Sequence, residues 1–166
     1  MKQILLLSLS AALCLLSACG AQPEAPEPME FPEAPPELTV TAGEASCTAL
    51  RGGWSWNYQL EDGSYSGAIA DSVHPLEARE ITPVLETSEP EAALTFALEP
   101  DAVAARCWPE EAWGDADAPG EDVSLEGDTL PLRPGGWLYQ VSASWDRMPG
   151  FAGDCQYSFF VRSTPE

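Results

Sequence analysis

The sequence predicts an all-β protein whose folded part is a single antiparallel β-sandwich. Apolar side chains alternate with polar ones in short segments, which is the period-two pattern of strands with one buried face. Turn signals rich in Gly, Pro and Asp separate these segments, and only residues 75–84 and 109–113 suit a helical turn. Of the 166 residues 45% are hydrophobic, so the chain is able to bury one core.

The first residues are typical of an export signal. Lys2 precedes an apolar run over residues 4–16, which is far shorter than the about 20 residues of a membrane-spanning helix. The run ends in Leu16-Ser17-Ala18-Cys19-Gly20, and this pentapeptide resembles the lipobox of bacterial lipoproteins. The resemblance implies a signal peptide over residues 1–18 and acylation of the Cys19 thiol. The alternative is an ordinary secretory signal in which Ala18 precedes a chance cysteine.

The resemblance also implies where the protein is found. Acyl chains on Cys19 hold a mature chain at the extracytoplasmic face of the cell membrane without any spanning helix. The chain as a whole is similar to small lipoproteins of Gram-positive bacteria, and that similarity implies no activity. Removal of residues 1–18 also removes Lys2, the only lysine, which leaves the mature chain one unit more negative than the formal charge of −20.

Residues 19–37 predict a lipidated cysteine followed by a disordered linker. Residues 20–37 contain six prolines, five glutamates and no basic residue. Proline interrupts helices and sheets and like charges repel, so we expect an extended tether. Met29 and Phe31 are the two side chains there that suit docking onto the domain, which we expect to span residues 38–166.

Within residues 38–166 the alternating segments predict seven or eight short strands. The clearest is 137–145, and after a connection containing Pro149 and Gly150 the alternation resumes at 155–161, which predicts a terminal hairpin. Earlier segments with the same pattern are 54–58, 94–98 and 103–107. Asp62-Gly63 and Glu99-Pro100-Asp101 are the expected turns.

The segment before and within the 137–145 strand carries a second resemblance. Leu132, the Pro134-Gly135 turn and Tyr139 look like the tyrosine corner of fibronectin type III and other immunoglobulin-like domains. The resemblance implies an immunoglobulin-like β-sandwich in which the Tyr139 hydroxyl bonds back to the turn backbone. The spacing is one residue longer than in those domains, so either the corner is bulged or Trp137 is the packed aromatic.

Five cysteines reduce to three within the domain. Cys14 belongs to the signal peptide and Cys19 to the lipobox, which leaves Cys47, Cys107 and Cys155. An extracytoplasmic location permits a disulfide, and three thiols make at most one. The sequence does not choose among the three pairings, and the alternative is that the thiols are buried as small apolar groups.

Catalytic chemistry has little support in this sequence. The one histidine, His74, follows Asp71 and Ser72 directly, whereas the groups of a catalytic triad converge from separate elements. We therefore expect a turn at this point, and we expect no enzyme activity and no cofactor. One histidine and scattered thiols also lack the ligand spacing of a zinc site.

An acidic stretch over residues 110–128 partly matches a calcium-binding loop. Asp115, Asp117, Gly120 and Glu126 occupy positions one, three, six and twelve of that pattern. Pro119 stands where a third side-chain ligand belongs, and no helices are expected on either side. A solvated acidic loop between strands is therefore the prediction, with calcium as the alternative.

Charge and aromatic content limit the partners. The formal charge of −20 excludes nucleic acid as an expected ligand, because no basic stripe can displace phosphate counterions. Among six tryptophans we expect Trp108 and Trp113 to be exposed as ligand-binding aromatics. The expected partner is a basic envelope protein or peptide, or a neutral glycan. These features predict a non-catalytic binding module, and the alternative is a structural or regulatory accessory of another envelope protein.

Overall fold

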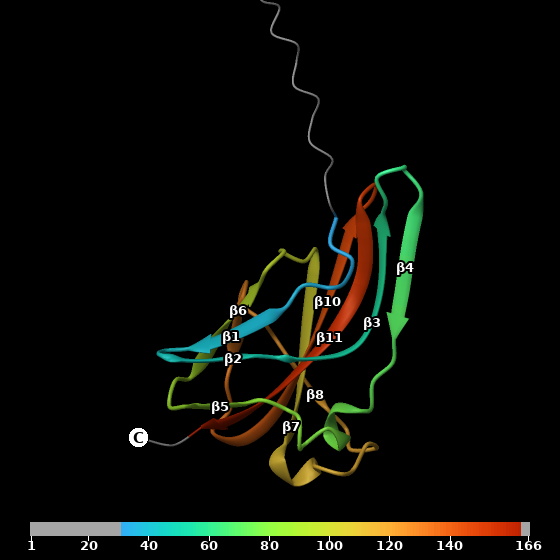
Figure 1. Cartoon of the computed structure of the whole chain (residues 1–166). Coiled ribbons are helices and arrows are strands. Elements are labelled where there is room, and N and C mark those ends of the chain that lie inside the picture. Colours follow the sequence, from blue (N-terminus) through green and yellow to red (C-terminus); the bar gives the residue numbers. More distant parts are fainter. Residues whose placement is uncertain (1–30, 164–166) are drawn as a thin grey trace, which may run out of the picture.

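The structure is a computed structural model that describes residues 31–163. The signal peptide, Cys19 and most of the expected tether lie outside the described residues. The described part is all-β, with eleven strands and two single-turn 3-10 helices (Figure 1). Neither helix is long or apolar enough to cross a membrane.

The strands follow one another along the whole described chain. Their bounds are Leu38–Ala42 (β1), Ala45–Thr48 (β2), Leu50–Gln59 (β3), Tyr65–Ala70 (β4), Val84–Thr87 (β5), Glu91–Phe96 (β6), Ala102–Pro109 (β7), Glu121–Val123 (β8), Thr129–Pro131 (β9), Gly135–Arg147 (β10) and Phe151–Ser163 (β11). The helical turns are Pro75–Glu77 (η1) and Glu110–Ala112 (η2), inside the two segments where the sequence permits them.

The strands form two sheets. The smaller sheet has the order β2-β1-β6-β9, and the larger has the order β4-β3-β11-β10-β7-β8. The β10–β11 hairpin is the longest pairing and runs without interruption from Gly135 opposite Ser163 to Arg147 opposite Phe151. The strands expected at 54–58, 94–98, 103–107, 137–145 and 155–161 are all present, although β6 ends at Phe96.

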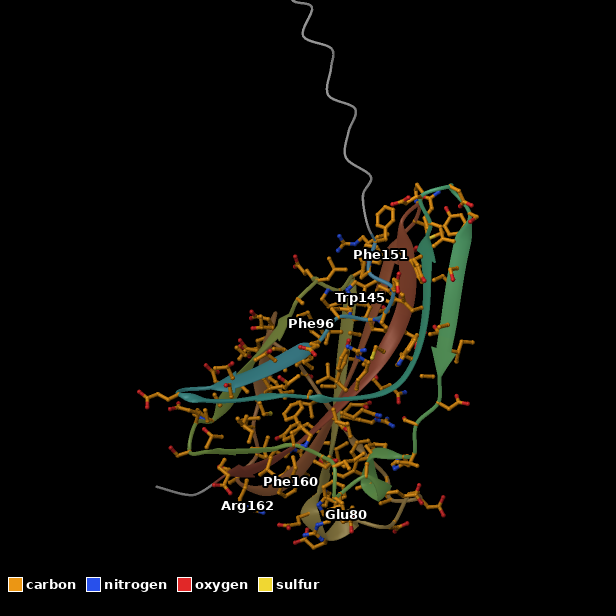
Figure 2. All side chains as sticks on the ribbon, viewed as in Figure 1. Glu80, Phe96, Trp145, Phe151, Phe160 and Arg162 are labelled. Atoms are coloured by element: carbon orange, nitrogen blue, oxygen red, sulfur yellow. The ribbon has the colours of Figure 1, made fainter. Side chains whose placement is uncertain are left out.

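The main core lies between the two sheets. Side chains of β10 alternate as predicted, so that Tyr139, Val141 and Trp145 are buried between the sheets. Trp145 packs edge-on against both Trp56 and Phe96, at ring-centroid distances of 5.3 and 6.0 Å. In Figure 2, Phe96, Trp145 and Phe151 lie toward the end where the β3–β4 and β10–β11 hairpins turn, and Phe160 lies toward the other end.

Residues 31–37, which the sequence assigned to the linker, pack against the sandwich. The Phe31 ring lies 6.2 Å from the Phe151 ring. Trp56 Nε1 donates a hydrogen bond to the Pro32 carbonyl at 2.6 Å, and the Tyr157 hydroxyl donates one to the Pro36 carbonyl at 2.6 Å. Residues 31–37 therefore pack together with the domain expected at 38–166, and Phe31 docks as its apolar side chain suggested. Their proline carbonyls can still accept hydrogen bonds.

Two details of the sheets differ from the prediction. Eleven strands replace the seven or eight expected, because strands as short as β8 and β9 are too brief to show an alternating pattern. The pair β5–β11 is parallel, whereas all other pairs are antiparallel. β3 pairs with β11 as far as Ser158, and β5 takes over from Phe160 onward.

Candidate functional site

A groove of about 710 Å³ opens between the two sheets where β6 of the smaller sheet is followed by β7 of the larger. Its floor is apolar and comes from both sheets and from the β8–β9 connection. Its rim is acidic. The floor residues are Leu94, Phe96, Val103 and Leu125, and the rim residues are Glu99, Asp101 and Asp128.

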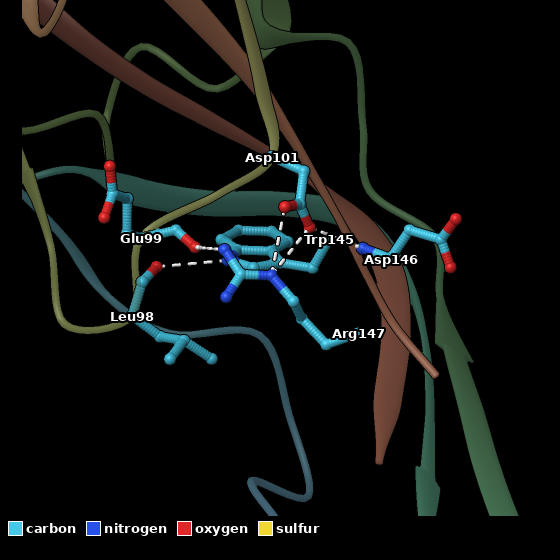
Figure 3. A network of polar contacts seen from close by, with 6 residues as sticks. All are labelled: Leu98, Glu99, Asp101, Trp145, Asp146 and Arg147. Atoms are coloured by element: carbon cyan, nitrogen blue, oxygen red, sulfur yellow. Dashed lines mark hydrogen bonds and ion pairs between the residues drawn. The ribbon is translucent and has the colours of Figure 1, made fainter. Parts of the chain in front are cut away.

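The turn between β6 and β7 is held in shape by the end of β10. Arg147 Nε lies 3.0 Å from both carboxylate oxygens of Asp101, and an Arg147 Nη donates to the Glu99 carbonyl at 3.2 Å (Figure 3). Trp145 Nε1 donates to the Leu98 carbonyl at 3.1 Å. The rim is therefore fixed by contacts that reach 45 or more residues along the chain.

Among the rim carboxylates, that of Asp101 accepts hydrogen bonds from the end of β10. The backbone N–H of Asp146 donates to it at 2.8 Å, and this bond, together with the Arg147 guanidinium, lowers the pKa of Asp101 below its usual value. Asp101 therefore stays ionised. Glu99 and Asp128 form none of the salt bridges found among residues 31–163. The rim thus keeps a net negative charge after Arg147 has neutralised Asp101.

Trp108 is not an exposed ligand-binding residue, which corrects the expectation from the sequence. It is 2% exposed and forms a second core with Leu76, Leu138 and Phe160. The reason is that η1 and the segment after η2 cover it: its Nε1 donates to the Ala118 carbonyl at 3.0 Å, and the His74 ring packs edge-on at 5.7 Å.

Trp113 is half-buried at the margin of this second core. Its ring lies 5.8 Å from that of Phe160, and the Arg79 guanidinium lies over its ring, 5.8 Å from the centroid. Neither tryptophan lines the groove between β6 and β7. The residues that do line it escaped the sequence analysis because Leu94, Phe96 and Val103 alternate like ordinary core residues.

The calcium pattern is not assembled in the structure. Within residues 31–163 no three His, Cys, Asp or Glu side chains form a group that could hold a metal ion. Asp115 accepts a bond from the Asp117 N–H at 3.2 Å, which closes a local turn. Gly120 has a different role from the one the pattern assigned, because a Cβ there would lie 2.7 Å from the Trp108 indole.

Three of the eight carboxylates in the acidic stretch over residues 110–128 form ion pairs. Glu121 pairs with Arg133 at 2.6 Å. Two other carboxylates of the stretch pair with arginines at 3.2 Å, Glu110 with Arg79 and Asp122 with Arg106. The sequence did not indicate these pairs, because each depends on which strands and turns become neighbours in the fold.

The other residues singled out by the sequence are the three cysteines of the domain, His74 and Tyr139, and each is placed by contacts within the fold. Cys47, Cys107 and Cys155 are free thiols, and burial raises the pKa of each, that of Cys155 to about 11. His74 caps the N-terminus of η1, where its Nδ1 accepts from the Leu76 N–H at 3.3 Å, which agrees with the turn expected there. The Tyr139 hydroxyl accepts from the Arg133 N–H at 2.8 Å, the bond expected of a tyrosine corner.

Comparison with protein-family models, with curated proteins and with solved structures finds no match for this chain.

Proposed function

We propose that this protein is a lipid-anchored extracytoplasmic module that binds a basic segment of another protein and catalyses no reaction. The observation that carries the proposal is the groove between β6 and β7, whose floor is apolar and whose rim is acidic. Arg and Lys side chains suit such a site, because their aliphatic stems pack on apolar surface while their charged ends reach carboxylates.

Charge on the rim and on the whole chain favours the same partner. Glu99 and Asp128 offer carboxylates that form no salt bridge in the described part of the chain. The net charge of −20 attracts cationic partners over longer distances and raises their association rate at low salt. Binding should therefore weaken as salt rises through about 0.1 M, where the Debye length is about 10 Å.

The immunoglobulin-like resemblance is part of this proposal. The hydrogen bond from Arg133 to the Tyr139 hydroxyl and the two facing sheets support it. Folds of that class present binding surfaces at loops that join their sheets. The groove is built around such a connection, Ala97–Asp101, between one sheet and the other.

A binding experiment with paired variants tests the groove. The probe is an Arg/Ser peptide, compared with a Gln/Ser peptide of the same length. Replacing Glu99→Gln and Asp128→Asn together should weaken binding of the Arg/Ser peptide by about fivefold, as expected for two partly exposed charge pairs. The control changes two exposed carboxylates away from the groove, Glu44→Gln and Glu77→Gln. An equal effect of both pairs would overturn the proposed site.

The anchor is tested separately. Cells expressing the full chain and its Cys19→Ser variant are supplied with labelled palmitate and fractionated. The proposal expects label and membrane association in the wild-type chain and neither in the variant. Label that persists in Cys19→Ser would show that Cys19 is not the acylated residue, with no bearing on the groove.

A further inference from the structure

Five strands within residues 31–163 pair on one side only, and β4 is the one of them that lacks protection against further pairing. β8 carries Glu121 and Asp122 and has three residues. β9 is equally short and ends in Pro131. β2 and β5 lie next to each other, and β5 also carries the charged Glu86. Charges, proline, shortness and covering segments are the usual means by which proteins protect sheet edges.

β4 lies at the margin of the larger sheet and pairs on one side only, with β3 (Figure 1). Its six residues, Tyr-Ser-Gly-Ala-Ile-Ala, include no charge and no proline. Tyr65 is 50% exposed and Ile69 is 79% exposed, and Gly67 and Ala68 between them are exposed as well. The free side of β4 is therefore a row of backbone N–H and C=O groups open to a further strand.

We propose that β4 binds an extended segment of a partner protein as an additional strand, and that this segment has an uncharged centre and basic ends. Backbone hydrogen bonds along β4 would supply affinity, and alternate side chains would contact Tyr65 and Ile69, which share the outer face of the sheet. This surface lies at the opposite edge of the larger sheet from β7 and β8, so it is distinct from the groove.

Charges at both ends of β4 decide the occupant. Glu61 and Asp62 precede the strand and Asp71 follows it, and all three are exposed. An added strand with basic residues at its two ends would meet carboxylates at each end of β4, about 20 Å apart for six residues. Opposite charges placed this way fix the register of the added strand as well as favouring its binding.

The same charges argue against a second copy of this chain. Antiparallel pairing of two β4 strands would bring Asp62 of one copy near Asp71 of the other, and parallel pairing would bring each acid near its own equivalent. In both arrangements carboxylates of the two copies would lie close to each other at both ends of the paired strands. Like charges placed opposite each other across strands are destabilising, and the net charge of −20 on each copy adds to the repulsion.

The test uses the full chain and a synthetic probe peptide. The probe has a Thr/Val stretch about as long as β4, with a pair of arginines at each end. Amide hydrogen exchange should slow at alternate residues of β4 when the probe is added, because only every second amide faces the free side. A control peptide with prolines in the Thr/Val stretch keeps the charges but cannot pair, and it should give no protection.

Paired variants distinguish the effect of the carboxylates at the two ends of β4 from the effect of the net negative charge of the whole chain. Glu61→Gln with Asp71→Asn should weaken probe binding by about fivefold. Glu80→Gln with Glu111→Gln changes the net charge equally at two exposed residues away from β4 and should have little effect. Ile69→Lys, which puts a charge into the strand itself, should also weaken binding while leaving the groove variants' effect on the Arg/Ser peptide unchanged.

Three outcomes would overturn the proposal. One is equal protection by the probe and by its proline control. Another is protection of β4 that rises with protein concentration in the absence of peptide, which would make a second copy the occupant. The third is protection by the probe at the groove and not at β4. Each outcome is independent of whether Cys19 is acylated.

Discussion

Trp108 and Trp113 occupy different surroundings although both lie near η2. Trp108 is enclosed by the second core, and Trp113 lies half-buried at its margin, beside Phe160 and under the Arg79 guanidinium. Trp108→Ala should lower the free energy of unfolding by about 3–5 kcal/mol, because it leaves a cavity and an unpaired Ala118 carbonyl. Trp113→Ala should cost roughly half as much or less. Urea unfolding of both variants measures the difference, and equal small losses would contradict the burial of Trp108.

The raised pKa of Tyr139 predicts how the stability of the fold changes at alkaline pH. Burial raises the pKa of Tyr139 to about 12, whereas an unfolded tyrosine ionises near pH 10. Between these values the unfolded chain has lost the proton and the folded chain retains it, so the contribution of Tyr139 to stability is complete below about pH 10 and is lost as pH rises toward 12.

Tyr139→Phe should therefore flatten the fall in stability between about pH 10 and 12 while lowering stability at neutral pH by about 1 kcal/mol, since the Arg133 N–H loses its acceptor. Burial also raises the pKa values of Cys155 and Tyr157, so part of the alkaline loss should remain in the variant. Denaturant unfolding across this pH range is the measurement. An unchanged slope would contradict the buried, neutral Tyr139 hydroxyl.

At the level of elements, residues 31–37 behave as part of the sandwich. They fill the space beside Phe151 and accept hydrogen bonds from Trp56 and Tyr157. A chain that begins at Leu38 would leave both of these donors without their acceptors and would expose Phe151. We expect it to be less stable than a chain that begins at Phe31 by about 2–5 kcal/mol.

Thermal unfolding of the two shortened chains checks this prediction. A third chain in which Phe31→Ala removes only the ring contact serves as a control and should fall between them. If the chain starting at Leu38 unfolded at the same temperature as the one starting at Phe31, residues 31–37 would contribute nothing to the fold.

At the scale of the whole molecule, charge repulsion opposes folding. Carboxylates far outnumber the seven basic residues, and the five ion pairs of the described residues are all on the surface, where such pairs contribute little. Raising NaCl from about 0.01 to about 0.3 M shortens the Debye length to below 10 Å and should raise the melting temperature. A melting temperature that falls with added salt would show that specific ion pairs outweigh the net repulsion.

The local pattern of the sequence determined most of the strands and the class of fold. Period-two alternation in 137–145 and 155–161 was sufficient, because burying one face of a strand requires apolar residues at every second position. The resemblance of residues 132–139 to a tyrosine corner implied a bond from the Tyr139 hydroxyl to the turn backbone, with Trp137 as the alternative packed aromatic, and the hydroxyl bonds the Arg133 N–H six residues away. Local signals carry this information because the interacting groups are close along the chain.

Only the tertiary structure decided which residues lie together in the second core, in the groove and at the sheet edges. Trp108 is buried because η1, from a segment more than 30 residues earlier, packs over the outer face of the larger sheet. The groove combines β6, β7 and the β8–β9 connection, and its rim depends on Arg147 from β10. The openness of β4 follows from its place at the end of the sheet order. The alternating pattern predicts that a side chain faces inward. Which side chain it then contacts depends on which strands become neighbours, and packing between distant segments decides that.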